Sequence, residues 1–375
     1  MPARTIFLLL IPILMAQVLS LQPSWFLVKE HSVGNLSQVT EKAKVYVAKT
    51  FTEATLSSVN SIPYDTVVFT GDVMLGRYVE TLMIENGSTY PYSALSLNKL
   101  SAKPAVVGNF EAAMALIHTQ TPHNTLRFSV SNDYLEAFSE QFTHASLANN
   151  HSLDFNEEAY LNTVHLLEKQ SVDVFGHNSR IDKSSLSYLE TKRGVIALLG
   201  INASQHIPEE SELVTLTQKA KRRSDFQVAY IHWGDEYEPK HSDTQEVLAG
   251  VLVTAGVDLI IGHHPHVVQD IDLINGVPVF YSLGNYIFDQ YFSSEVKQGL
   301  VVALRLEETP ALELIPVSSK EKKSRPTQND DLSRQTFLNE LASRSHPSLK
   351  ESIEAGRINL FEPVATSTKM AIMWQ

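Results

Sequence analysis

The sequence predicts a layered α/β fold with mixed sheets. Short apolar runs rich in Val and Ile alternate with stretches of helical spacing, and this alternation is typical of α/β proteins. After Gly262 the strand-like runs follow each other more closely, which indicates an added antiparallel portion. The 375-residue chain is 43% hydrophobic and 19% charged, and this globular composition supports at most two domains with a large core.

The first part of the expected fold contains six short apolar runs. Buried strands have this length and this preference for β-branched residues. Residues 156–170 have the pattern of a helix, with Asn156 as a candidate N-cap and Leu161, Val164 and Leu167 at helical spacing. The strand-like runs are 66–70, 105–107, 144–148, 195–199, 228–231 and 259–261.

The later part of the chain predicts closely spaced strands. Asn275 and Gly276 form a strong turn signal between the first two of them. Residues 319–335 are charged and polar, which predicts a linker or an exposed excursion. We therefore expect a domain over residues 64–318, followed by a polar linker and C-terminal extension over 319–375. The expected late strands are 267–274, 278–283, 299–306 and 312–317.

Residues 1–22 have the layout of a targeting segment, with one arginine ahead of an apolar run over 6–15. The run is short for a membrane span and contains Pro12, so we expect a signal peptide cleaved near Ser20, with an uncleaved anchor as the alternative. Residues 23–63 are then a lead-in segment. The body is expected to be secreted or periplasmic, or on the outer face of the cytoplasmic membrane. Membrane contact is expected only through an uncleaved N-terminal segment.

Charge and cysteine content exclude several classes of function. Thirty Lys and Arg against 42 Asp and Glu give a net charge of −12, with no long basic run, which argues against nucleic-acid binding. The chain has no cysteine, so disulfide scaffolds, cysteine-ligated zinc, iron–sulfur clusters and thiol nucleophiles are excluded. The 14 histidines remain as the main candidates for chemistry.

Polar residues gather where five of the apolar runs end. Loops at the carboxyl ends of strands converge in an α/β sheet, so these side chains are expected to surround one site. Taken singly, Asp72 is explained as well by a turn and His232 by a structural role. Three histidines within four residues gain little from packing, which favours ligand function. The five clusters are Gly71–Asp72, Asn109 with Glu111, Asn149–Asn150–His151, His232–Trp233 and His263–His264–His266.

This set of side chains predicts a divalent metal site. Imidazole nitrogens and carboxylate oxygens suit zinc, manganese or iron. A bridging carboxylate could hold two ions about 3.5–4 Å apart, so one or two ions are expected.

Six short motifs, given at the end of this paragraph, follow one another along the chain in the order of a known family. They resemble the CapA family of capsule-synthesis proteins, which is associated with poly-γ-glutamate and looks like a branch of the calcineurin-like metallophosphoesterases. The resemblance covers roughly residues 65–305 and implies an α/β/β/α metallophosphatase-like sandwich. The motifs are FTGDVMLG (69–76), GNFE (108–111), LANNHSLD (147–154), IHWGDEY (231–237), IGHHPHVV (261–268) and YSLGNYIFDQ (281–290).

The resemblance also implies roles for individual residues. His151 matches the imidazole that protonates a leaving group. His263 competes with His264 for the register of the closing histidine pair, and spacing alone leaves both open. The implied metal ligands are Asp72, Glu111, Asn150, His232, His264 and His266.

Two residues depart from the phosphoesterase pattern that the resemblance implies. The first motif there is Asp-x-His, whereas this chain has Met74 in place of the histidine. Glu111 stands where an Asp is usual and has a longer reach. A weakened or absent first metal therefore becomes plausible, while one ion is still sufficient for hydrolysis.

Three further residues are candidates for contacts around this site. Asn109 is expected either to bond the site through its amide or to form a turn. Asp154 is expected either to orient His151 or to act as an acid at a helix N-terminus. Arg77 is expected either to meet an anionic substrate group or to be a solvated helix residue.

Trp233 and Glu236 follow His232 and are candidates for a pocket wall, with core packing as the alternative for Trp233. Asn285 lies on the last motif of the resemblance and is a further candidate for the surroundings of the site.

Three classes of function fit these observations. One is a metal-dependent hydrolase of the cell envelope, acting on a phosphoester or a γ-glutamyl amide. Another is a non-catalytic accessory protein for making or exporting a polyanionic polymer, within an envelope polymer-synthesis complex. The third is an envelope protein that captures an anion. The expected partners are therefore an anionic polymer or phosphoester substrate, and Asn150 next to His151 favours the enzyme.

Overall fold

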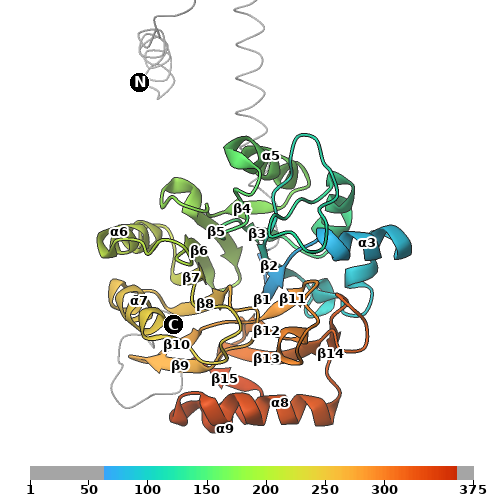
Figure 1. Ribbon diagram of the computed structural model, residues 1–375. Coiled ribbons are helices and arrows are strands. Elements are labelled where there is room, and N and C mark those ends of the chain that lie inside the picture. Colours follow the sequence, from blue (N-terminus) through green and yellow to red (C-terminus); the bar gives the residue numbers. More distant parts are fainter. Residues whose placement is uncertain (1–62, 361–375) are drawn as a thin grey trace, which may run out of the picture. The chain divides into compact units, whose positions relative to one another are not determined.

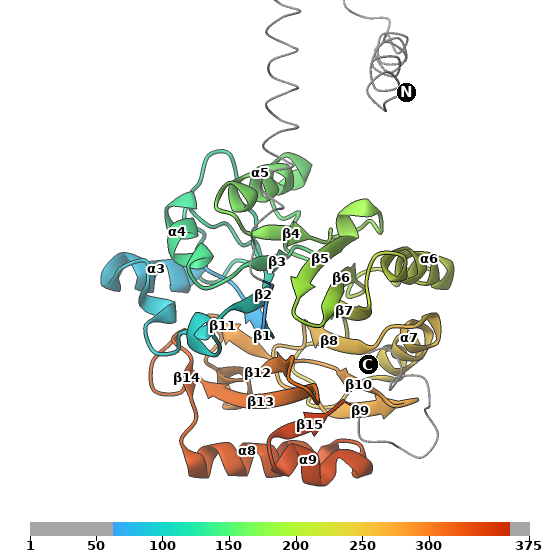
Figure 2. The same cartoon turned by 180° about the vertical axis from the view of Figure 1, so that it is seen from behind.

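The structure, a computed structural model, describes residues 63–360 and contains two β-sheets covered by helices (Figures 1 and 2). The expected targeting segment 1–22 and nearly all of the lead-in segment 23–63 lie outside the described residues. Within residues 63–360, no helix is long and apolar enough to cross a membrane.

The larger sheet has nine strands. Its main order is β14-β13-β12-β1-β2-β3-β4, while β11 pairs with β1 and β15 with β13. Strands β1 to β4 run parallel, and β12 joins β1 antiparallel, so the sheet is mixed. The strands are β1 (Thr66–Val73), β2 (Pro104–Phe110), β3 (His144–Ser146), β4 (Asp173–Phe175), β11 (Asn285–Ile287), β12 (Gln298–Arg305), β13 (Ala311–Ser318), β14 (Thr327–Gln328) and β15 (Arg357–Asn359).

The smaller sheet has six strands in the order β5-β6-β7-β8-β10-β9. Strands β6, β7, β8 and β10 run parallel, and β5 and β9 pair antiparallel at the two edges. The strands are β5 (Leu186–Thr191), β6 (Gly194–Asn202), β7 (Phe226–His232), β8 (Leu259–His263), β9 (Ile271–Ile274) and β10 (Val277–Phe280).

Helices cover the outer faces of both sheets, as Figures 1 and 2 show. Buried side chains of both sheets, such as Val107 and Val228, form one core between the sheets. A second core joins the nine-stranded sheet to α3, α4 and α5, and a third joins the six-stranded sheet to α6 and α7. The predicted α/β/β/α sandwich with mixed sheets is therefore confirmed. The helices are α3 (Arg77–Asn86), α4 (Leu135–Ser139), α5 (Asn156–Lys169), α6 (Glu210–Lys221), α7 (Asp243–Ala255), α8 (Asp331–Arg344) and α9 (Lys350–Glu354).

Two short sequence signals, for a hairpin turn and for a helix start, are found in the structure as a turn and a helix cap. Asn275 and Gly276 have positive φ angles of 50° and 84° and connect β9 to β10 as the hairpin turn. Asn156 accepts a hydrogen bond on its side-chain oxygen from the backbone N–H of Ala159, 3.1 Å away, which caps the first turn of α5.

The chain beyond residue 318 adds to the sandwich. Strand β14 lies within the stretch expected as a polar linker and pairs with β13, and β15 pairs with β13 farther along. On α8, Phe337, Leu338 and Leu341 have helical spacing and enter the core between the sheets. Residues 327–359 are therefore packed with the domain rather than extending away from it.

One close approach of two backbone segments brings β1 to the last motif. A Cβ atom at Gly71 would lie 1.9 Å from the carbonyl oxygen of Gly284, so only glycine fits there. Beyond this point β1 exchanges its partner β12 for β11, and Asp72 pairs with Asn285. The end of β1 is thereby held beside the segment that follows β10.

Candidate metal centre

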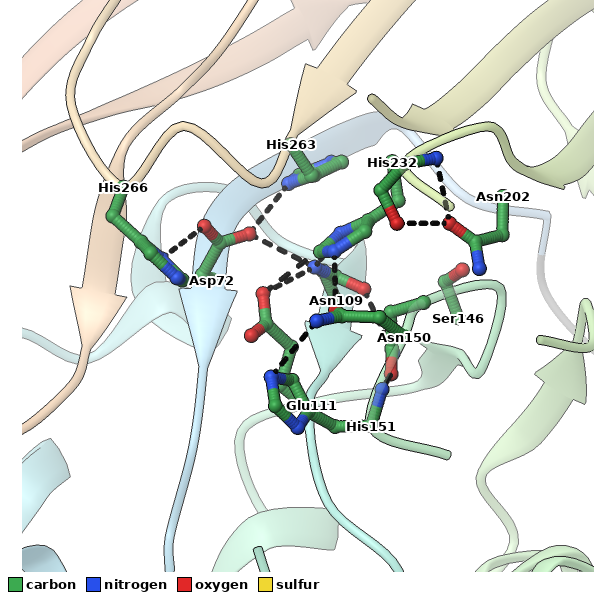
Figure 3. A network of polar contacts seen from close by, with 12 residues as sticks. Asp72, Asn109, Glu111, Ser146, Asn150, His151, Asn202, His232, His263 and His266 are labelled. Atoms are coloured by element: carbon green, nitrogen blue, oxygen red, sulfur yellow. Dashed lines mark hydrogen bonds and ion pairs between the residues drawn. The ribbon is translucent and has the colours of Figure 1, made fainter. Parts of the chain in front are cut away.

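The candidate site lies where strand ends from the two sheets meet (Figure 3). Asp72 and Asn109 lie near the carboxyl ends of β1 and β2, and His232 and His263 are the last residues of β7 and β8. The loop after β3 brings Asn150 and His151 to the same place. Parallel strands present their carboxyl ends at one edge, which explains how residues far apart in sequence converge.

The amide of Asn109 connects three of the predicted ligands. Its nitrogen lies 2.8 Å from Asp72 Oδ1, 2.9 Å from Glu111 Oε1 and 3.1 Å from His232 Nδ1. One ligand atom from each of Asp72, Glu111 and His232 lies within 4.8 Å of the others, and all three side chains are buried. The expected amide contact of Asn109 is therefore present, and it holds the two carboxylates close together.

All three histidines at and after the end of β8 reach the site. Both Asp72 Oδ2 and Asn285 Oδ1 lie 3.0 Å from His266 Nδ1, and His263 Nδ1 lies 3.3 Å from Asp72 Oδ1. The ring of His264 lies 4.6 Å from that of His232. His263 and His266 thus contact Asp72, while His264 faces His232.

The backbone of this segment is strained. His264 and His266 have φ angles of 97° and 59°, in a region that non-glycine residues rarely adopt. Such conformations cost about 1–3 kcal/mol each and persist where the surrounding structure enforces them, as it does at functional sites.

Several buried ligand atoms in this cluster have no hydrogen-bond partner among the described residues. They are Glu111 Oε2, His263 Nε2 and His264 Nδ1. A buried polar atom without a partner costs about 1–3 kcal/mol, so a cluster of them needs an explanation. Carboxylate oxygens and imidazole nitrogens are ligands for a divalent transition metal, so this donor set fits such an ion.

The protonation states also fit metal binding. Burial, with the nearby His264, holds the pKa of His232 well below its usual value, and burial lowers the pKa of His264 to about 4. Both imidazoles are therefore neutral near pH 7, which is the form that binds metal. Burial alone would raise the pKa of Asp72, but the contacts with the His263 and His266 imidazoles outweigh it and hold that pKa well below its usual range.

Glu111 shows the electrostatic cost of placing two carboxylates together. Burial and the neighbouring Asp72 raise its pKa well above the ordinary value. A divalent cation between the two carboxylates would offset this repulsion.

His151 lies next to this cluster in a fully paired environment. Its Nδ1 lies 2.9 Å from Asp154 Oδ2, and its Nε2 lies 3.1 Å from the amide nitrogen of Asn150. Its ring stacks on Phe128 at 3.8 Å. The amide oxygen of Asn150 lies 2.8 Å from His232 Nε2, so Asn150 connects His151 to the ligand cluster. The expected contact between Asp154 and His151 is present.

Arg77 does not have the free guanidinium that binding an anionic substrate group requires. Its guanidinium forms a bidentate ion pair with buried Asp289 and also donates to the carbonyl of Thr125 at 3.0 Å. The alternative of a solvated helix residue is also wrong, because Arg77 is buried against the ring of Phe128.

The two residues expected to form a pocket wall have different surroundings. Trp233 lies in the core under α6 and α7, and its indole N–H donates to the carbonyl of Tyr281 at 2.8 Å, so it is a packing residue. Glu236 is exposed and acts on the site only through its charge, which contributes to the raised pKa of Glu111.

Two residues that contribute to the site, Asn149 and Phe128, were not assigned a role from the sequence. Asn149 donates to Asn109 Oδ1 at 3.2 Å and accepts from the backbone N–H of His151 at 3.0 Å, so it joins the two parts of the site. Asn149 lies within the motif LANNHSLD (147–154), so the sequence already marked it as a member of a polar cluster. Phe128 lies in a polar loop outside every motif, so no signal in one sequence distinguishes it.

Comparisons with known proteins find a matching family and several similar proteins. The family described as "Bacterial capsule synthesis protein PGA_cap" matches residues 66–290. The chain is 30% identical to the PGA biosynthesis protein CapA of Bacillus subtilis, over 84% of this chain and 85% of the relative. It is 31% identical to the capsule biosynthesis protein CapA of Bacillus anthracis, over 70% and 69% of the two chains. A probable polyglutamine synthesis accessory protein of Mycobacterium tuberculosis is 23% identical, over 60% and 74%.

Proposed function

Because the chain belongs to the PGA_cap family of bacterial capsule synthesis proteins, we propose that it acts in the synthesis, export or processing of capsule or poly-γ-glutamate through a metal-dependent phosphoesterase-like site. The proposed reaction is hydrolysis of a phosphoester or a γ-glutamyl amide. The proposed location is outside the cytoplasm, which rests on the targeting pattern of residues 1–22.

One observation carries this proposal. Buried carboxylate and imidazole atoms of Glu111, His263 and His264 have no hydrogen-bond partners among the described residues, and Asn150 connects His232 of the same cluster to the paired His151. A structural ion needs only the first group, whereas hydrolysis also needs a proton donor. The proposed ligands are Asp72, Glu111, Asn150, His232, His264 and His266, with His263 beside Asp72.

The protein's own residues then have separate tasks. A divalent ion held by this donor set would supply Lewis acidity toward a phosphoryl or amide oxygen. Asp154 accepts a hydrogen bond from His151 Nδ1–H and so directs Nε2 toward the ligand cluster. In the imidazolium form, in which Nε2 has taken up a proton and no longer accepts from the Asn150 amide, His151 donates that proton to the leaving oxygen or nitrogen, while the Asp154 carboxylate stabilises the charged ring.

A non-catalytic accessory role is the second candidate. Met74 favours it, because this chain lacks the histidine of the related phosphoesterase motif and so has one ligand fewer than that motif provides. In this role the site would serve binding or structure while another protein performs the chemistry.

The test begins with metal content of the full chain, measured by elemental analysis after incubation with manganese or zinc. We expect one or two ions per wild-type chain and a loss of ions in a His264→Ala, His266→Ala double variant. His241→Ala is the matched control, because His241 also pairs with a carboxylate, Asp270 at 2.8 Å, but is not a proposed ligand. It should keep its ions.

Hydrolysis of a phosphodiester and of a γ-linked glutamate oligomer is then compared across the same variants. Activity that follows metal content supports the hydrolase. Wild-type protein that binds no metal after reconstitution overturns the metal site and leaves the accessory role. Metal without hydrolysis of either substrate also favours the accessory role.

A further inference from the structure

A hollow of about 540 Å³ opens beside His151 and is not part of the ligand cluster. It is connected to His151 through Asp154, which lines the hollow and also accepts the hydrogen bond from His151 Nδ1. Its walls are mainly apolar and come from the loop before Arg127 and from the start of α5. They include Leu116, Leu153, Phe155 and Ala159, with Arg127, Asp154 and Glu158 as the charged members.

Arg127 is held in place at this hollow. Its Nε and Nη2 donate to the backbone carbonyl of Asp154 at 2.8 Å and 2.5 Å, and its guanidinium lies 4.3 Å from the centre of the Phe155 ring. These contacts leave its charge uncompensated, because no carboxylate of residues 63–360 forms an ion pair with it. A guanidinium oriented in this way has further N–H groups available for an anion.

The contrast with Arg77 shows why this arginine can bind a ligand. Arg77 is buried and neutralised by Asp289, whereas Arg127 is exposed and bonded only to a neutral carbonyl. In a protein with a net charge of −12, an oriented cation at the edge of the site is the group that would bind an anion locally.

We propose that this hollow is a binding subsite for one carboxylate-bearing unit of an anionic polymer, with the carboxylate on Arg127. The proposal rests on the proposed function and names its substrate class as a chain of γ-linked glutamyl units. Each such unit combines a free carboxylate with two methylene groups. Arg127 matches the carboxylate, and the walls formed by Leu116, Leu153 and Phe155 match the methylene groups.

Glu158 sets a limit on what the hollow accepts. It is exposed on the first turn of α5 and repels carboxylates, so a single carboxylate oriented toward Arg127 fits better than a densely charged segment. Replacing Glu158 should therefore tighten binding, which gives the experiment two variants with opposite expected effects.

The test measures binding separately from hydrolysis. Full-length protein stripped of metal is titrated calorimetrically with a γ-linked glutamate oligomer and with the same oligomer carrying amides in place of its carboxylates. We expect Arg127→Gln to weaken binding of the acidic oligomer about tenfold, which corresponds to about 1.4 kcal/mol. Arg127→Lys should bind with intermediate affinity, and Glu158→Gln should bind about two- to threefold more tightly. The amidated oligomer should bind weakly and equally to all four proteins.

Equal affinity of wild type and Arg127→Gln for the acidic oligomer overturns the subsite, and so does equal binding of the two oligomers to wild type. If Arg127→Gln does not fold, Glu158→Gln and the amidated oligomer decide the question. Failure of the proposed function has a different result. In that case the oligomer binds in an Arg127-dependent way but is not hydrolysed when metal is supplied.

Discussion

The two sides of the candidate site differ in how their polar atoms are paired. On the ligand side, Glu111 Oε2, His263 Nε2 and His264 Nδ1 are buried without hydrogen-bond partners among the described residues. On the other side, both ring nitrogens of His151 are paired, with Asp154 and with Asn150, and its ring stacks on Phe128. Only Asn149 and Asn150 connect the two sides through hydrogen bonds on the described chain.

This difference indicates different tasks. Buried ligand atoms without hydrogen-bond partners cost free energy in a folded protein. A bound cation would offset this cost, because it interacts favourably with carboxylate oxygens and imidazole nitrogens. A histidine whose tautomer is set by a carboxylate is prepared for proton transfer. Changes on the first side should therefore remove metal and activity together, and changes on the second side should remove activity alone.

The largest effect is expected for His232→Ala. This change removes a buried ligand and leaves Asn150 Oδ1 without its partner at 2.8 Å. Metal affinity should fall by more than about 100-fold, because loss of partners that merely orient ligands already costs about 10–100-fold. Calorimetric titration with zinc or manganese measures this fall. Unchanged affinity would remove His232 from the ligand set, and His241→Ala should bind like wild type.

His151→Ala should separate the two sides most clearly. Metal content should stay at the wild-type value, while hydrolysis falls by about 10²–10⁴-fold, the usual contribution of general acid catalysis. Elemental analysis and rate measurements on the same preparation give both numbers. An equal loss of metal would show that His151 is a ligand and that the division into two sides is wrong.

Asp154→Asn should give a smaller loss of the same kind. The variant keeps the shape of the side chain but weakens the contact that orients His151 Nδ1. We expect kcat to fall roughly 10–100-fold with metal content unchanged. Asn156→Ala, which alters the same loop by removing a helix cap, is the control for a loss caused only by local destabilisation. If that control loses as much activity, the orienting role fails.

Much of the fold could be predicted from single segments. The runs that became β1, β2, β6, β7 and β8 are rich in Val and Ile because both faces of these strands are buried. Strands β4 and β11 have only three residues each, too few to show a pattern. Strand β15 is equally short, and its place in the sheet depends on pairing with β13 far from it in sequence.

The site could be predicted as a set of residues but not as an arrangement. The six motifs identified the residues that meet, because strand ends converge in this kind of fold. They could not show that Arg77 is neutralised by Asp289, which is 212 positions away in the sequence. They also do not include Arg127, whose charge stays free. They also left open the order of His263 and His264, because a strained backbone decides which ring faces Asp72.

The smallest effect is expected for Met74→His, which tests whether the missing ligand of the first motif can be restored. The side chain of Met74 is fully buried in the core against α3, and its sulfur accepts the backbone N–H of Gly76 at 3.1 Å. Asp72 meanwhile contacts His263 and His266. A histidine at position 74 would bury a polar ring in that core, so we expect a loss of about 1–3 kcal/mol in unfolding free energy and no additional bound ion. Chemical denaturation and elemental analysis measure the two quantities. An additional ion in this variant would mean that the ligand side has space for a second metal that only Met74 excludes.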